Sequence, residues 1–182
     1  RKVDPSVTKD SPVTAEIVAK IKEMEFFGYQ FEGADASFEL LIRKSLGAYK
    51  PFFTLEKFKT IGEQISGEDF SPATAVVKVS VDGTSEISAA EGNGPVNALD
   101  VALRKALERF YPSLKEFALT DYKVRILDSK ETSSAKTRVL IESGDGKDIF
   151  TTVGVSRDII EASLTALKDA IEYKLIKDGV TP

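Results

Sequence analysis

One hydrophobic pattern occurs twice along the chain, about sixty residues apart. Two alternating apolar positions return sixty-two residues later, Val77 as Val139 and Val79 as Ile141. The helical stripe that begins at Leu99 returns sixty-one residues later, and the one-residue difference falls in the loop before the helix. Self-similarity at a fixed period is typical of a duplicated supersecondary unit. We therefore predict two copies of one unit, over residues 53–112 and 113–182.

Each copy has the pattern of three strands followed by one helix. In the first copy, residues 53–61 and 77–81 have strand-like spacing, and Asp82-Gly83 is a two-residue hairpin signal that leads to a short third strand. An amphipathic helix is expected after Pro95. The second copy repeats this order. The fold class is therefore predicted to be α+β, with a pseudo-duplicated βββα-βββα domain.

A helical segment precedes the two copies. Apolar spacing predicts one helix from about Thr14 to Gly28 and a second that starts at an N-cap, Asp35. The apolar stripe of the second helix is expected at Phe38, Leu41, Ile42 and Leu46. Such a pair buries too little surface to fold alone. We therefore expect residues 1–52 to be a helical linker subdomain and residues 53–182 to be a separate domain. Five aromatic residues lie near the pair: Tyr29, Phe31, Tyr49, Phe52 and Phe53. A small local core is one interpretation of them, and the favoured one is that the segment faces a missing domain.

The composition excludes several kinds of chemistry. The 182 residues contain no cysteine and no histidine, which removes thiolate nucleophiles, disulfides and Cys/His zinc sites. A net charge of −4 provides no basic field of the kind that nucleic-acid binding needs. No stretch approaches the roughly eighteen apolar residues of a membrane span. We expect a cytoplasmic protein that binds neither nucleic acid nor membrane, and the start at Arg1 indicates a fragment of a longer protein.

The loop before the first repeat's helix is the strongest binding candidate. It reads Glu91-Gly92-Asn93-Gly94-Pro95-Val96-Asn97-Ala98. Two glycines let the backbone approach a small ligand, and a helix N-terminus offers N–H groups and a favourable dipole to a carboxylate. A structural role is also open, in which glycine only tightens the turn and Pro95 only starts the helix. The second copy has a loop of the same kind at Gly154–Asp158, and this repetition favours a ligand.

Two other kinds of site fit the sequence less well. The glycine loop lacks the third glycine of a dinucleotide-binding motif, because Asn97 stands there, and no Lys-Ser/Thr pair follows it. Three carboxylate pairs could do acid–base work or hold magnesium: Glu23 with Glu25, Glu32 with Asp35, and Asp145 with Asp148. Such pairs more often lie on solvated faces or cap helices. An enzyme that uses these carboxylates is therefore the least favoured hypothesis.

Four segments together resemble one protein family. They are residues 28–41, the run GNGPVNALDVALRKAL from Gly92, the segment Asp121–Arg125, and residues 154–163. In this order they resemble the C-terminal part of the citramalate synthases, a branch of the α-isopropylmalate synthase family, over nearly the whole chain. The resemblance implies a linker subdomain followed by a regulatory domain that forms a homodimer. It places the catalytic (β/α)8 barrel, which holds a divalent metal and condenses acetyl-CoA with a 2-oxo acid such as pyruvate, before Arg1. No catalytic residue, metal or cofactor is therefore expected in this fragment.

In this family the regulatory domain binds the end product of the pathway and lowers activity. The resemblance implies an effector pocket made of Gly92, Asn93, Gly94, Val96, Asn97, Leu119, Tyr122, Ile126, Ala135, Ser156, Asp158 and Ile159. An amino acid needs N–H donors for its carboxylate, an acceptor for its ammonium group and an apolar wall for its side chain. Family loops often have aspartate where Asn97 stands, so the expected partner of the ammonium group is Asp158.

The leading hypothesis is a feedback-inhibition and dimerisation module that binds isoleucine. Two alternatives stay open: the leucine-sensing domain of an α-isopropylmalate synthase, and a dimerisation scaffold that senses nothing. One branched methyl group changes the preference of a pocket by only about 1–3 kcal/mol. The sequence therefore does not decide between isoleucine and leucine.

Overall fold

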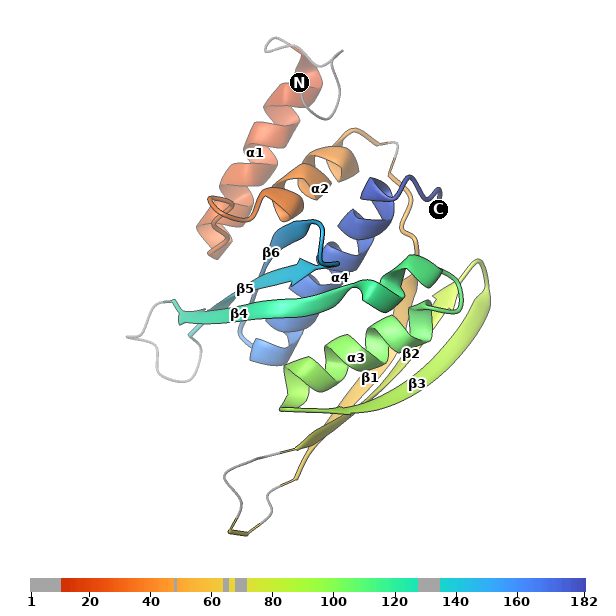
Figure 1. The fold of residues 1–182 in the computed structure, drawn as a ribbon. Coiled ribbons are helices and arrows are strands. Elements are labelled where there is room, and N and C mark those ends of the chain that lie inside the picture. Colours follow the sequence, from red (N-terminus) through yellow and green to blue (C-terminus); the bar gives the residue numbers. More distant parts are fainter. Residues whose placement is uncertain (1–10, 48, 64–65, 68–71, 128–134) are drawn as a thin grey trace. The chain divides into compact units, whose positions relative to one another are not determined.

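The computed structural model describes residues 11–47, 49–63, 66–67, 72–127 and 135–182 (Figure 1). Two helices come first: α1 (Pro12–Phe27) and α2 (Asp35–Ser45). The first repeat follows as β1 (Thr54–Gly62), β2 (Ala73–Val81), β3 (Thr84–Gly92) and α3 (Pro95–Leu107). After a short 3-10 helix, η1 (Pro112–Glu116), the second repeat is β4 (Ala118–Ile126), β5 (Thr137–Gly144), β6 (Ile149–Ser156) and α4 (Ile159–Lys177). The predicted α+β class and the βββα-βββα order are confirmed.

The described residues divide into two compact units that do not follow the order of the chain. One unit comprises residues 1–50, 122–141 and 150–173, and the other comprises residues 51–121, 142–149 and 174–182. The domain limits expected from the sequence, 1–52 and 53–182, stay a prediction.

The first sheet has one covered face. Its strand order is β1-β2-β3, with antiparallel pairing, and residues of β2 alternate between buried and half-buried along its whole length. Such alternation is typical of a sheet with a core on one side. The apolar stripe of α3, with Leu99, Leu103 and Leu107 fully buried, packs on this face. The turn between β2 and β3 has positive φ at Asp82 (47°) and Gly83 (79°), the pattern of a type I′ hairpin, as the sequence predicted.

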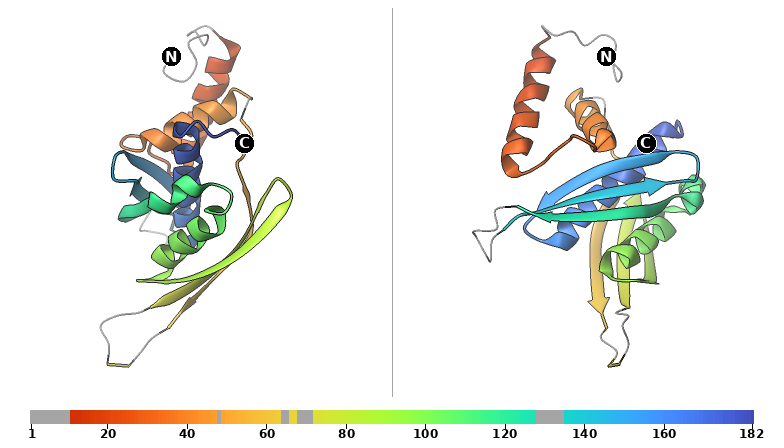
Figure 2. Two further views of the ribbon diagram at one scale, coloured as in Figure 1. Left: turned by 45° about the vertical axis from the view of Figure 1, so that its right-hand side comes forward. Right: turned by 60° about the vertical axis from the view of Figure 1, so that its left-hand side comes forward.

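The second sheet is covered differently. Its order is β4-β5-β6, and residues 152–155 of β6 are buried without alternation. Gly154 faces α4, whereas Val153 lies in a cluster with Phe31 and Ala34. In the right view of Figure 2 the helical pair lies above this sheet and α4 crosses behind it. Because β6 is covered on both faces, the apolar residues Val153, Gly154 and Val155 follow one another in its inner part without alternation.

The helical pair therefore packs on the chain's own sheet. Phe31 is buried against β6, and Phe52 and Phe53 are buried elsewhere, so the expectation that these aromatic residues face a missing domain is wrong. The expected stripe of α2 is only partly right. Leu41 packs against the cluster of Phe31, but the buried residues of the helix are Ala36, Ser37 and Leu40, and Phe38 is 36% exposed. Asp35 is the first residue of α2 rather than its N-cap.

Small and polar residues on α2 make the closest contacts. The buried Ser37 Oγ accepts a hydrogen bond from the Val153 amide of β6 at 3.0 Å and donates one to Asp169 Oδ2 of α4 at 3.0 Å. The Tyr173 hydroxyl of α4 donates to Glu39 Oε2 of α2 at 2.8 Å. Burial raises the pKa of Tyr173, and this hydrogen bond adds to the rise. Hydrogen bonds of polar side chains thus attach the helical pair to β6 and α4, and the spacing of apolar residues does not predict such bonds.

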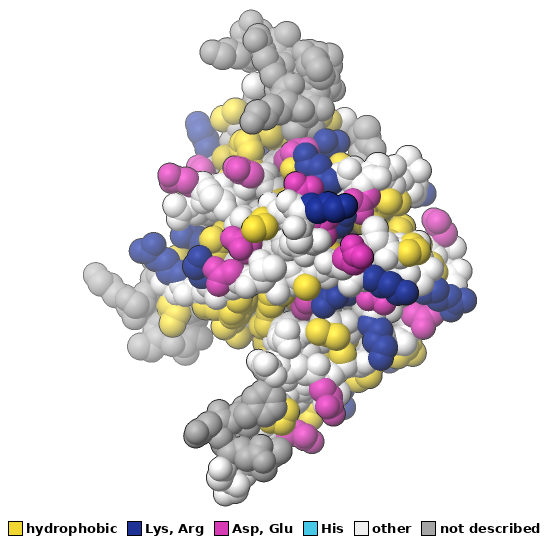
Figure 3. Space-filling model, viewed as in Figure 1, with side chains coloured by type: hydrophobic (Ala, Val, Ile, Leu, Met, Phe, Trp, Pro, Cys, Tyr) yellow, Lys and Arg dark blue, Asp and Glu magenta, His cyan; other side chains and the backbone are white. Residues whose placement is uncertain are grey.

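Charges of both signs are interspersed over the face drawn in Figure 3. In the parts of the chain that the structure describes, no helix combines the length and the apolar character that crossing a lipid bilayer requires.

Candidate functional site

Gly92, at the end of β3, owes its identity to packing. A Cβ atom at this position would lie 2.5 Å from the backbone nitrogen of Ala98 and 2.6 Å from Asn97 Oδ1. Real Cβ atoms do not approach so closely, so only glycine lets β3 pass this near to the first turn of α3. Packing against α3 is therefore enough to explain why residue 92 is glycine, and no ligand is needed for that explanation.

Gly94, unlike Gly92, has open space around it. It is the N-cap of α3 with φ of 106°, and a Cβ placed on it would meet nothing within 4 Å. No side chain caps this helix, and Pro95 at its first position has no N–H. Asn97 Oδ1 instead accepts a hydrogen bond from the Asn93 amide at 3.0 Å, which folds the loop back on itself. The positive end of the α3 dipole thus has no side-chain cap, and it lies beside half-buried Val96 and Asn97.

The N-terminus of α4 is already occupied by its own loop. Asp158 Oδ1 accepts hydrogen bonds from the amides of Ile160 at 2.7 Å and Glu161 at 3.2 Å, as an N-cap does. Ser156 Oγ accepts from the Asp158 amide at 3.1 Å and donates to Glu161 Oε2 at 3.0 Å. The two repeats therefore differ in kind, because the chain caps α4 and leaves α3 without a side-chain cap.

The proposed apolar wall lies on β4. Leu119 and Tyr122 are half-buried, whereas Ile126 is 64% exposed, so this strand does not end in a sealed interior. The Tyr122 hydroxyl lies 3.1 Å from Ser163 Oγ, and Ser163 donates to the carbonyl oxygen of Ile159 at 2.6 Å. This chain of contacts fixes the Tyr122 ring against the first turn of α4.

The structure brings the predicted residues together in two sets. One set is the α3 loop with Leu119, whose amide donates to Asp100 Oδ2 at 3.4 Å within the same unit. The other set, in the other unit, is Tyr122, Ile126, Ala135, Ser156, Asp158 and Ile159. Ala135 is half-buried and follows residues outside the described part of the chain. That all twelve line one pocket stays a prediction.

Sequence reasoning missed two buried polar residues beside these sets. Ser163 is fully buried and holds Tyr122, and Asp100 is 3% exposed and binds both the Leu119 amide and Arg104. The i,i+4 spacing of Asp100 and Arg104 was a readable signal for a helical ion pair. Nothing in the sequence distinguishes Ser163 from other small residues of a helix.

Two of the three carboxylate pairs contain a residue with a structural partner. Asp145 Oδ1 accepts from the amides of Lys147 and Asp148 at 2.9 Å, and Asp145 Oδ2 lies 2.9 Å from Lys174 Nζ. Glu23 forms an exposed ion pair with Lys20. Within the described residues, no three acidic side chains gather as a metal site would require.

Comparison with known proteins identifies the family. The LeuA allosteric (dimerisation) domain matches residues 32–175. The chain is 55% identical to (R)-citramalate synthase of Geobacter sulfurreducens, over 91% of this chain and 31% of that protein. It is 51% identical to (R)-citramalate synthase of Aquifex aeolicus, over 92% of this chain and 32% of that protein. The 2-isopropylmalate synthase of Aquifex aeolicus is 31% identical over 71% of this chain and 24% of that protein.

The chain spans about a third of the length of the citramalate synthases that it matches. The family match covers both repeats and α2, and thus most of the described elements. The resemblance expected from the four sequence segments is confirmed. The chain belongs to the LeuA allosteric (dimerisation) domain family.

Proposed function

We propose that this chain is the effector-sensing and dimerising module of a citramalate synthase and that it binds isoleucine. Support comes from the relatives, since those named (R)-citramalate synthase are 45–55% identical over more than 90% of the chain in four organisms. The catalytic barrel, with its divalent metal and its acetyl-CoA and pyruvate sites, would lie in the rest of the longer protein. The module itself would carry no catalytic group.

The observation that carries the proposal is the difference between the two helix N-termini. α4 is capped by Asp158, whereas α3 has only Gly94 and the favourable end of its dipole. In this proposal the carboxylate of the effector takes the place of a side-chain cap at α3. Leu119, which belongs to the same unit as this loop, supplies part of the apolar wall for the branched side chain.

Inhibition of the catalytic barrel would then correspond to a coupling free energy of about 1–3 kcal/mol between the effector site and the catalytic site. The effector would stabilise one of two arrangements of the protein, because a ligand shifts an equilibrium only through its difference in affinity for two states.

Isothermal titration of the chain with isoleucine, leucine and valine tests the proposal. We expect the largest affinity for isoleucine. A larger affinity for leucine would identify a leucine sensor, and absence of heat with all three, together with a dimer by sedimentation, would leave only a scaffold.

A matched pair of variants tests the carboxylate site. Gly94→Asp and Gly94→Asn introduce side chains of the same shape at the same backbone position, where φ is 106°, so their strain is equal. Only the aspartate adds a negative charge that competes with the effector carboxylate at the helix dipole. We expect G94D to weaken isoleucine binding about tenfold relative to G94N. Equal affinities of the two variants would place the carboxylate elsewhere.

A further inference from the structure

An amino acid bound at the α3 loop needs an acceptor for its ammonium group. The sequence predicted Asp158 for this role, but Asp158 Oδ1 accepts the amides of Ile160 and Glu161 and so caps α4. Asp158 also belongs to the unit that contains residues 150–173, whereas the α3 loop belongs to the unit that contains residues 51–121. An acceptor within the unit of α3 would complete the site.

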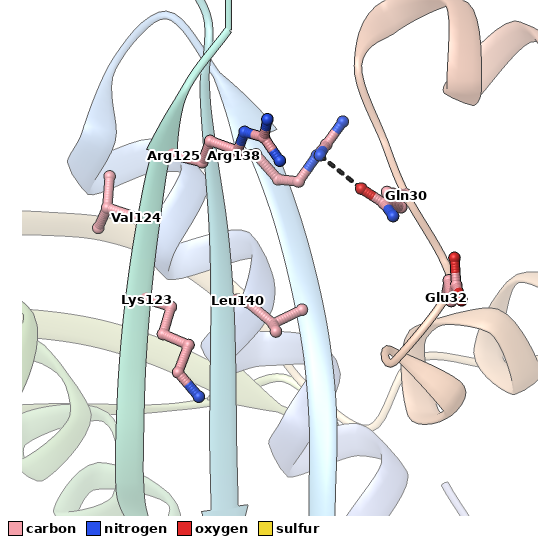
Figure 4. Close-up of a pocket in the computed structure, with 7 residues that line it drawn as sticks. All are labelled: Gln30, Glu32, Lys123, Val124, Arg125, Arg138 and Leu140. Carbon is pink, nitrogen blue, oxygen red and sulfur yellow. Dashed lines mark hydrogen bonds between the residues drawn. The ribbon is translucent and has the colours of Figure 1, made fainter.

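The cavity beside β4 and β5 shares no residue with the α3 loop. It encloses about 260 Å³, and all of its lining residues belong to the unit that does not contain α3. Its Arg138 is held by the chain itself, because Nε donates to the Gly28 carbonyl oxygen at 2.7 Å and Nη1 donates to Gln30 Oε1 at 2.8 Å (Figure 4). Of the twelve predicted effector residues, all of which the structure describes, none lines this cavity.

Asp100, the only acidic residue of α3, lies close to the N-terminus of that helix. It follows Asn97 by three residues and Val96 by four, so both are its neighbours on the helix surface. Helical side chains lean toward the N-terminus of their helix, which brings the Asp100 carboxylate over the first turn of α3. Leu119 adjoins it, because the Leu119 amide donates to Asp100 Oδ2 at 3.4 Å. Asp100 therefore lies between the α3 N-terminus and the residue that we assign to the apolar wall.

One carboxylate oxygen of Asp100 has no partner. The side chain is 5% exposed, and Arg104 Nε and Nη2 both donate to Oδ2, at 3.1 and 3.0 Å, as the Leu119 amide does. No group of the described residues donates to Oδ1. Among the described side chains, only Ser88 Oγ is both sealed from solvent and without a partner, so Oδ1 is open to a ligand. Because a buried carboxylate is costly unless it is hydrogen-bonded, a donor on the ligand would be favourable there.

Building on the proposed function, we infer that Asp100 selects an α-amino acid at this site, with Oδ1 accepting a hydrogen bond from the ammonium group. The effector carboxylate would meet the positive end of the α3 dipole, so each charge of the effector would face a charge of the opposite sign. Arg104 would orient Asp100 through Oδ2 and leave Oδ1 free. The site would therefore disfavour a carboxylate of the same shape that lacks the amino group, because Oδ1 would then stay unpaired.

Three probes of similar shape test this role by isothermal titration: isoleucine, 3-methylpentanoate, which lacks the amino group, and isoleucinol, which lacks the carboxylate. We expect the wild type to bind isoleucine about tenfold more tightly than 3-methylpentanoate, as a hydrogen bond between charged groups allows. Asp100→Asn should weaken the binding of isoleucine and of isoleucinol about tenfold and leave that of 3-methylpentanoate within about twofold. If Asp100 only supported the fold, D100N would affect all three probes alike.

Further variants separate Asp100 from its surroundings. Glu86→Gln removes another carboxylate of the same unit, one that pairs with Arg109, and should leave all three affinities unchanged. G94D should weaken the binding of isoleucine but not that of isoleucinol, which has no carboxylate to be repelled. Asp100→Ser should repeat the pattern of D100N, and it provides a second uncharged side chain in case D100N does not fold.

The outcomes distinguish this role from the proposed function. If the wild type binds isoleucine and D100N and D100S bind it equally well, the role of Asp100 is overturned and the proposed function stands. Equal losses for isoleucine and 3-methylpentanoate would likewise overturn it, since they would show a structural role. Absence of heat with isoleucine in the wild type would refute the proposed function and the role of Asp100 together.

Discussion

Replacing Gly154 with alanine is expected to lower the free energy of unfolding by about 3–4 kcal/mol. A Cβ atom there would lie 1.9 Å from the carbonyl oxygen of Ala162, 2.9 Å from its carbonyl carbon and 3.2 Å from the Ala166 nitrogen. These are backbone atoms of α4, so no side-chain rotation relieves the overlap. Either α4 moves away from β6 or the strand distorts, and both changes disrupt a fully buried interface.

Chemical unfolding followed by far-ultraviolet circular dichroism measures this effect. The matched control is Gly62→Ala at the end of β1, where φ is ordinary and a Cβ would meet nothing within 4 Å. G62A should change the free energy of unfolding by less than about 1 kcal/mol, and it could stabilise the strand slightly. Similar midpoints for G154A and wild type would mean that α4 does not lie as close to β6 as described here.

Asp145→Ala is expected to lower the free energy of unfolding by about 2–3 kcal/mol. Asp145 accepts two backbone hydrogen bonds within the β5–β6 turn and pairs with Lys174, whose side chain is only 9% exposed. Without Asp145, Lys174 keeps its ion pair with Asp178. The loss should appear as a lower unfolding midpoint at neutral pH.

The same residue gives stability a defined pH dependence. The hydrogen bond from the Asp148 amide, with those from Lys174 and the Lys147 amide, holds the pKa of Asp145 well below its ordinary value. A carboxyl group with a lowered folded-state pKa contributes stability above its unfolded pKa, about 4, and loses it as the pH falls further. Wild type should therefore lose stability below about pH 4 more steeply than D145A.

Asp148→Ala is the control, because it lies in the same turn with an exposed side chain and uses backbone atoms for its contacts with Asp145. D148A should keep both the stability and the acid dependence of wild type within about 0.5 kcal/mol. If D145A and D148A followed the same curve, the assigned role of Asp145 would be wrong.

The order of elements could be predicted because both repeats have strong periodicity. Alternation at Val77 and Val79, the Asp82-Gly83 turn and the α3 stripe are local signals, and the structure has each of them where expected. The contacts of the helical pair could not be predicted in this way. Ser37 is buried because its hydroxyl group joins β6 to α4, and hydrophobic spacing assigns no inward position to a serine.

The same limit applies to the candidate site: its local features could be predicted, and its contacts between distant segments could not. The sequence could identify both strand–helix loops, but it could not tell glycines required by packing, Gly92 and Gly154, from Gly94, which has open space around it. It also could not tell that Asp158 caps its own helix, because capping and ligand binding use the same oxygen atoms. Such distinctions depend on distances between segments that are far apart in the chain.

The hydrogen bond from the Val153 amide to Ser37 also bears on self-association. β6 is the outer strand of its sheet, and unpaired amides on an outer strand invite a foreign strand to pair with them. Ser37 occupies one of these amides and brings α2 alongside it, which obstructs strand addition there. At this one amide, α2 thereby takes the place that a neighbouring strand would otherwise fill.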